Sequence, residues 1–177
     1  MVAAILSGPC PVRPAPAREP VCCAFQNLLY RSVTIETMPI RVVTPADLEA
    51  VIALWHRVFP EYNDPRYPQR DPRTNILRKL AFGDGLFWLG HHGHRVVGTV
   101  MAGYDGHRGW IYSLGVDPDH RRGGLGRALV AHAETELRTR GCPKINLQVL
   151  DTNTGALNFW RSLGYGADEV ISLGKRL

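Results

Sequence analysis

The sequence has few of the features that mark membrane, secreted or metal-binding proteins. No apolar run approaches the roughly 18 residues that a membrane-spanning helix needs. The four cysteines form neither a zinc-site spacing nor a Cys-x-x-Cys motif, since Cys22 and Cys23 are adjacent and the other two stand alone. These absences predict a protein of the reducing cytoplasm that neither spans nor binds a membrane.

Long blocks of one charge are absent as well. The formal net charge is +5, and the arginines are scattered along the chain. A mildly basic chain suits a ligand with several phosphates, whereas nucleic-acid binding is not expected without a basic tract. With 177 residues, 45% of them hydrophobic, the chain is long and apolar enough for one domain with a substantial core.

Residues 1–37 lack the periodicity of a helix or a strand. Five prolines interrupt them, at positions 9, 11, 14, 16 and 20. This composition predicts a disordered tail in front of a folded domain at residues 38–177. Because the folded pattern begins directly after Met38, that methionine is an alternative start of the protein.

Histidines gather near two predicted turns and are not assigned to a metal. His91, His92 and His94 lie in or beside one hairpin turn, and His107 lies in the next. Solvated histidine is common in such turns, so we expect no bound metal.

The remaining pattern predicts an α/β fold with a mixed central sheet and about four helices. Short turns join three central strands into an antiparallel meander, and a helical crossover then leads to a parallel strand. The expected strands cover residues 40–43, 86–90, 96–104, 110–116, 144–150 and 168–173. The expected helices cover residues 45–59 and 72–82, a stretch that ends at Arg140, and residues 155–163.

A basic, glycine-rich turn lies between the strand at 110–116 and the next helix. Backbone N–H groups at such a turn point into one concavity, in front of the positive end of the helix dipole. Gly124 and Gly126 have no Cβ, which lets an anion approach the main chain, and Arg121 and Arg122 add charged donors at the rim. The stretch predicts a site for a phosphorylated ligand. Leu129 stands where a dinucleotide fingerprint has its third glycine, and no Gly-Lys-Ser/Thr occurs for a P-loop.

Two motifs together resemble the GNAT family of N-acetyltransferases. Arg121-x-x-Gly124-x-Gly126 after a strand is similar to that family's acetyl-CoA signature, and Asn153-x-x-Ala156 is similar to its second cofactor motif. The resemblance covers residues 39–177, and within the family it extends to the bacterial YpeA subgroup. That closer likeness lies in residues 103–109, residues 141–145 and the final Ser-Leu-Gly-Lys-Arg-Leu.

The resemblance implies acetyl transfer from acetyl-CoA to a primary amine, on a protein or a small molecule, by direct attack in a ternary complex. Acetyl-CoA would be a co-substrate, and the protein would be a monomer or a homodimer. The implied cofactor-binding residues are Leu114, Gly115, Val116, Arg121, Arg122, Gly123, Gly124, Leu125, Gly126, Arg127, Asn153, Ala156 and Trp160. The backbone at 114–116 would bind the pantetheine arm and polarise the thioester carbonyl.

The chain departs from the family pattern where proton transfer is concerned. Trp160 stands where the family often has a tyrosine acid, and an indole N–H is too weak an acid for that role. The strand at 110–116 carries no glutamate, so the candidate proton-transfer residues are Tyr112, Asp105 and His107. Turn geometry alone also explains Asp105. These departures leave open a non-catalytic acyl-CoA sensor or interaction module.

Overall fold

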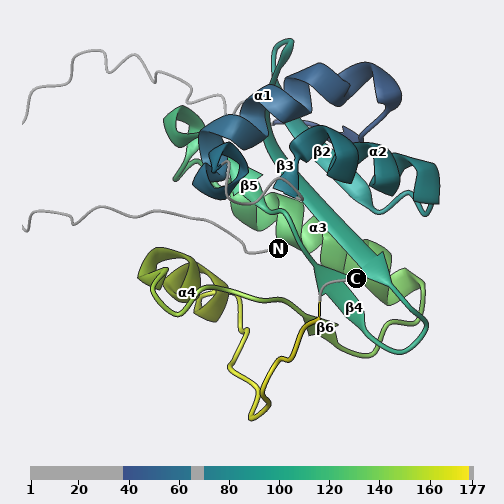
Figure 1. Cartoon of the computed structure of the whole chain (residues 1–177), viewed down its shortest axis with the longest axis vertical. Coiled ribbons are helices and arrows are strands. Elements are labelled where there is room, and N and C mark those ends of the chain that lie inside the picture. Colours follow the sequence, from purple (N-terminus) through teal and green to yellow (C-terminus); the bar gives the residue numbers. More distant parts are fainter. Residues whose placement is uncertain (1–37, 65–69, 176–177) are drawn as a thin grey trace, which may run out of the picture.

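The computed structural model describes residues 38–64 and 70–175, and the predicted tail at 1–37 lies outside them (Figure 1). A mixed sheet forms its centre, with an antiparallel meander followed by a parallel strand, which confirms the predicted fold class. In sheet order the strands are β1 (Ile40–Val42), β2 (Phe87–His92), β3 (Arg95–Tyr104), β4 (Gly109–Ile111) and β6 (Ile145–Asn146). The short strand β5 (Gly115–Val116) follows β4 in the chain and pairs with an earlier part of the same strand β3.

Helices cover both faces of this sheet (Figure 1). One apolar cluster lies between the sheet and α1 (Leu48–Val58) with α2 (Pro72–Phe82), and it centres on the fully buried Trp55. A second cluster joins the other face to α3 (Leu125–Thr139) and α4 (Thr154–Arg161). Short 3-10 turns precede or follow these helices at η1 (Pro45–Asp47), η2 (Pro60–Asn63) and η4 (Pro118–His120).

Two glycines of the sheet let α3 approach unusually closely near its first turn. Gly90 of β2 and Gly98 of β3 stand opposite each other in the antiparallel register. A Cβ on Gly98 would lie 2.8 Å from Leu125 Cδ2 and 3.0 Å from Leu129 Cδ1, and one on Gly90 would lie 2.7 Å from Leu125 Cδ1. Both leucines are buried, so they have little room to move. The glycine pair therefore fixes the height of α3 above the sheet.

We expect Gly98→Ala to lower the free energy of unfolding by about 1–3 kcal/mol, because the new methyl group overpacks a filled core. Urea unfolding followed by circular dichroism measures this change. Gly166→Ala is the matched control, since a Cβ at Gly166 would meet nothing within 4 Å. Equal stability of the Gly98→Ala variant and the parent would contradict the packing argument.

The strand predicted at 110–116 is two strands separated by a bulge. Tyr112 N–H still donates to Met101 O at 2.8 Å, but Leu114 N–H turns back to Tyr112 O at 2.8 Å. The ladder resumes where Gly115 pairs with Thr99, so Ser113 and Leu114 together stand opposite Val100. The bulge bends the chain just before the glycine-rich turn.

Two predicted strands are wrong in extent or in kind. The strand expected at 144–150 pairs with β4 only at Ile145–Asn146, because the bulge turns the following strand away from it. Residues 168–173, expected to form a last strand, form none. Within the described chain they contact residues 144–148 through side chains alone, and side-chain bonds do not make a ladder.

Candidate active site

The glycine-rich turn presents a row of open backbone amides at the start of α3. Arg122 and Gly124 both have left-handed backbone, with φ of 64° and 87°, which curls the chain between η4 and the helix. The first helical bond runs from Ala128 N–H to Gly124 O at 3.0 Å. The amides of Leu125, Gly126 and Arg127 therefore have no acceptor within the helix and face the turn. Such a concavity of N–H groups at a helix N-terminus binds anions.

The space in front of these amides is open. A Cβ on Gly124 would meet nothing within 4 Å, and one on Gly126 would lie 3.6 Å from both Phe159 Cε2 and Val116 Cγ2. Arg122 and Arg127 are exposed at the rim, and Arg127 Nη2 donates to Ser162 Oγ of the segment after α4 at 3.3 Å. The turn thus combines positive charge with room for a phosphate.

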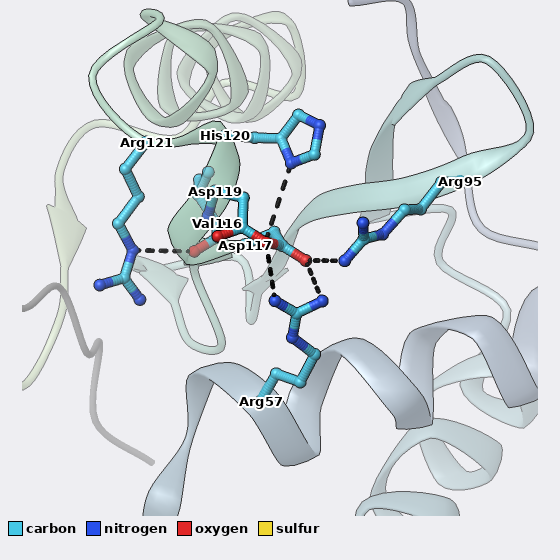
Figure 2. A network of polar contacts seen from close by, with 7 residues as sticks. All are labelled: Arg57, Arg95, Val116, Asp117, Asp119, His120 and Arg121. Carbon is cyan, nitrogen blue, oxygen red and sulfur yellow. Dashed lines mark hydrogen bonds and ion pairs between the residues drawn. The ribbon is translucent and has the colours of Figure 1, made fainter.

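A buried carboxylate anchors the entry to this turn (Figure 2). Asp117 is 1% exposed, and its Oδ2 accepts from Arg95 Nη2 at 2.8 Å and pairs with Arg57 Nη1 at 3.0 Å. Its Oδ1 accepts from Asp119 N–H at 3.0 Å. Burial opposes ionisation, but the Asp119 amide and the two guanidinium groups together hold the pKa of Asp117 below its ordinary value. Asp117 therefore joins α1 and β3 to the glycine-rich turn.

The Arg121 side chain, expected as a charged donor at the rim of the turn, is hydrogen-bonded back to β5. Its Nε donates to Val116 O at 3.0 Å, so the side chain lies back against β5 as well as beside the turn (Figure 2). Burial lowers the pKa of this guanidinium, which still leaves the group charged at neutral pH. The Arg121 side chain thus links β5 to the glycine-rich turn by a hydrogen bond.

The register of β5 leaves one backbone N–H of this strand that points away from β3. Asp117 N–H donates to Val97 O at 2.8 Å. Because hydrogen-bonded pairs alternate with non-bonded pairs along an antiparallel ladder, the backbone N–H of Gly115, two residues earlier, also points at β3. Val116 N–H points to the opposite side. Of the three amides expected to meet a thioester, Leu114 N–H is committed to Tyr112 O and Gly115 N–H to the ladder. Only Val116 N–H keeps the predicted direction.

The second motif, at Asn153 and Ala156, forms the start of α4, and this helix buries two of its side chains in the core. Asn153 Oδ1 accepts from Ala156 N–H at 3.0 Å and caps α4, and Ala156 is fully buried. Trp160 is 2% exposed and packs edge-on against Phe159 and Tyr165, with ring centroids 5.3 and 5.0 Å away. Its Nε1 is buried without a hydrogen-bond partner among the described residues.

Two of the three candidate proton-transfer residues, Asp105 and His107, lie in the β3–β4 hairpin, and Tyr112 directly follows β4. Asp105 Oδ1 accepts from His107 N–H at 2.8 Å and Arg108 N–H at 2.7 Å, which closes the β3–β4 hairpin and lowers the pKa of its carboxyl. At the rise of an extended strand, this exposed hairpin lies roughly 20 Å from the bulge. Tyr112 is next to the bulge in the chain, but its ring and hydroxyl lie against Gly103, on the hairpin side, and burial together with the charge of Asp105 raises its pKa. Of the three residues, only Tyr112 has its backbone beside the bulge.

Sequence reasoning missed three residues that shape this region. Asp117 is one of them, although an acidic residue before proline at a helix entry is a usual capping signal. Tyr62 OH lies 3.5 Å from Ser113 Oγ inside the bulge, where burial raises the pKa of Tyr62 to about 12. The contact between Tyr62 and Ser113 has no signal in the local sequence.

The described part of the chain contains no group of three or more His, Cys, Asp or Glu side chains placed to hold a metal ion. None of its helices is both long and apolar enough to cross a membrane.

Comparison with known proteins identifies the fold and the family. A model of the Acetyltransferase (GNAT) family matches residues 48–165. An acetyltransferase of Pectobacterium atrosepticum is 44% identical over 140 residues, which cover 79% of this chain and 96% of that protein. A solved GCN5-related N-acetyltransferase from Ralstonia eutropha is 26% identical, with a TM-score of 0.60, over 77% of this chain and 97% of that one.

The solved PaiA N-acetyltransferase of Thermoplasma acidophilum, in complex with coenzyme A, shares the fold at a TM-score of 0.67 and 17% identity. That match covers 75% of this chain and 92% of the other. With a family match over most of its described length and a relative above 40% identity, the chain belongs to the GNAT family of acetyltransferases.

Proposed function

We propose that this N-acetyltransferase transfers the acetyl group of acetyl-CoA to a primary amine by direct attack in a ternary complex. The observation that carries the proposal is the row of open amides at Leu125, Gly126 and Arg127, directly beside the one outward N–H of β5. A ligand with a pyrophosphate next to an extended arm fits this pairing of an anion site with a strand edge.

Each part of the donor has residues that suit it. The pyrophosphate accepts bonds from the amides between Arg122 and Arg127, with Arg122 and Arg127 as charged donors at the rim. The arm lies along β5, which in the described chain has a ladder partner only on the β3 side. Asn153 and Ala156 fix the start of α4 beside this path, and Trp160 packs beneath it.

The chemistry needs one new C–N bond and one broken C–S bond. The amine nitrogen attacks the thioester carbonyl carbon, and Val116 N–H donates to the oxygen as negative charge develops on it. Collapse of this intermediate expels the thiolate of coenzyme A, which takes a proton from water, while the amine loses its proton through Tyr112 and bound water. A phenol with a raised pKa stays protonated at neutral pH, so Tyr112 orients the water and does not itself act as an anion.

Two measurements test this function. Isothermal titration with acetyl-CoA should give saturable binding, and no binding at millimolar ligand would overturn the donor assignment. Release of coenzyme A thiol across a panel of peptide amines, polyamines and amino acids should depend on the acceptor. Binding without acceptor-dependent release would instead identify a sensor.

We expect Tyr112→Phe to lower kcat by about 100-fold with the best acceptor of the panel and to leave acetyl-CoA affinity unchanged, since only the hydroxyl is lost. Tyr104→Phe is the matched control, because its hydroxyl donates to Gly141 O at 3.3 Å on the other side of the hairpin. An unchanged kcat in Tyr112→Phe would remove this residue from the proton path.

A further inference from the structure

A cavity of about 1160 Å³ lies beside α4, in a part of the molecule that the proposed chemistry does not use. Its walls come from α4, the C-terminal half of α3, residues 142–150 and the segment at residues 163–172, which loops back to β6 (Figure 1). Among the described residues that line it, none belongs to β5 or to the glycine-rich turn. Trp160 alone is shared with the residues assigned to acetyl-CoA, so the cavity is a separate space.

Two polar atoms of the lining residues have no hydrogen-bond partner in the described structure. Trp160 is 2% exposed, and its Nε1 is a donor that is buried without an acceptor. Asn146 Oδ1 is an acceptor that is buried without a donor. Unpaired buried groups are costly, so the cavity favours a ligand that supplies one acceptor and one donor. An amide group supplies both, because its C=O accepts from Trp160 and its N–H donates to Asn146.

The charges that line the cavity are positive on balance. Of its two acidic residues, Asp168 is paired with Lys144, whose Nζ lies 2.6 Å from Asp168 Oδ2, and Glu134 accepts from a tyrosine hydroxyl at 2.8 Å. Arg138 of α3 and Arg161 of α4 also line the cavity, are exposed, and make no hydrogen bond or ion pair within the described chain. The uncompensated charge therefore favours an anionic group on the ligand over an ammonium group.

Apolar side chains make up much of the remaining lining. Leu147 and Val149 lie on one side, and Leu157 of α4 lies on another. Val170 and Ile171 also line the cavity, yet they are 75% and 88% exposed, so the cavity opens to solvent along their segment. A ligand can enter there, and an apolar body on the ligand would cover both side chains.

We propose that this cavity binds a small N-acylated amino acid with an apolar side chain. The amide of such a molecule pairs with Trp160 Nε1 and Asn146 Oδ1, and its carboxylate faces the two arginines of the lining. A free amino acid has no amide and carries an ammonium group, whereas a neutral acyl amino amide lacks the carboxylate. Both therefore fit this lining less well. The site does not depend on acetyl transfer, because it uses neither the glycine-rich turn nor Val116 N–H.

Isothermal titration of the full-length protein without acetyl-CoA tests the site with three probes that share one side chain. N-acetylphenylalanine should bind saturably, with a dissociation constant of about 1 mM or lower. Phenylalanine and N-acetylphenylalanine amide should each bind at least about fivefold more weakly, since each lacks one of the two recognised groups. Equal affinity for all three probes, or no saturable binding of N-acetylphenylalanine, would overturn the proposal.

Two substitutions locate the probe in the cavity. Asn146→Leu removes Oδ1 and keeps the size of the side chain, and Trp160→Phe removes the N–H and keeps an aromatic ring. Each should weaken N-acetylphenylalanine binding by about tenfold, because an unpaired polar group of the ligand is then buried. Trp88→Phe is the matched control, since Trp88 is a buried indole that packs against His132 outside the cavity. Parent-like affinity in both cavity variants would overturn the site.

A third substitution separates recognition of the carboxylate from recognition of the amide. Arg161→Gln at its exposed position on α4 should weaken N-acetylphenylalanine by about fivefold and leave the affinity for its neutral amide unchanged. Thermal unfolding of every variant checks the fold, and at this exposed site it should match the parent. Equal losses for the two probes would contradict the assigned role of the arginine and with it the anionic class of ligand.

Discussion

Replacing Gly126 with valine is expected to weaken acetyl-CoA binding by about 100-fold or more while the protein stays folded. The backbone of Gly126 is not left-handed, and a Cβ there would lie 3.6 Å from its nearest neighbours, so the free protein accommodates a side chain. The branched side chain would occupy the space through which a phosphate reaches the amides of Leu125 and Arg127. Loss of two or three charge-assisted hydrogen bonds accounts for a change of this size.

Gly124 gives a less discriminating variant at the same turn. Its φ of 87° means that any side chain strains the backbone, so lost binding would mix strain with obstruction. Gly166→Val is the control for Gly126→Val, because Gly166 lies in open space outside the turn. Isothermal titration with acetyl-CoA and thermal unfolding, measured on both variants, separate the two effects. Parent-like affinity in Gly126→Val would exclude the turn as the phosphate site.

Replacing Asp117 with alanine is expected to lower the free energy of unfolding by about 2–3 kcal/mol. The variant loses the bond to Asp119 N–H and leaves Arg57 and Arg95 without their shared anion. These two side chains are 44% and 51% exposed, so they regain solvent, which limits the cost. Urea unfolding at neutral pH measures the change, and a loss below 0.5 kcal/mol, roughly the scatter for neutral surface sites, would contradict the anchor.

Acidity provides an independent test of the same carboxylate. Its pKa is lower in the folded protein than in the unfolded chain, so ionised Asp117 contributes stability in full above about pH 4. That contribution is lost as the pH falls through the lower pKa of the folded state. The stability difference between the parent and Asp117→Asn should therefore shrink from pH 5 towards pH 3. A difference that stays constant over this range would show that charge is not the source.

The sequence allowed prediction of those parts of the site that are local in the chain. The glycine-rich turn, the start of α3 and the Asn153 cap each depend on residues within one turn of helix, and their residue types carry the signal. The crossover and the parallel pair follow from the order and length of the elements. The fold class, which the structure confirms, and the anion site, which stays a prediction, both rested on such short-range patterns.

The rest depended on contacts between distant segments. Asp117 gains its role from Arg57 on α1 and Arg95 on β3, and nothing beside it in the sequence indicates those partners. Gly115, where the ladder resumes after the bulge, is packed against Val58 and Phe59 of a distant segment, and a Cβ there would lie 2.7 Å from Val58 Cγ2. The strand expected at 168–173 has a suitable composition but no backbone partner in the described chain.

The glycine pair beneath α3 also ties two measurable properties together. The side chain of Leu125 packs on Gly90 and Gly98, and its backbone N–H is one of the open amides of the glycine-rich turn, the proposed phosphate site. A methyl group added at Gly98 would displace the Leu125 side chain, and this displacement would shift the Leu125 amide, although the methyl group itself would not contact the ligand. Affinity for the donor and core volume are thermodynamically coupled at this point, and a smaller side chain at Leu125 would relieve both penalties at once.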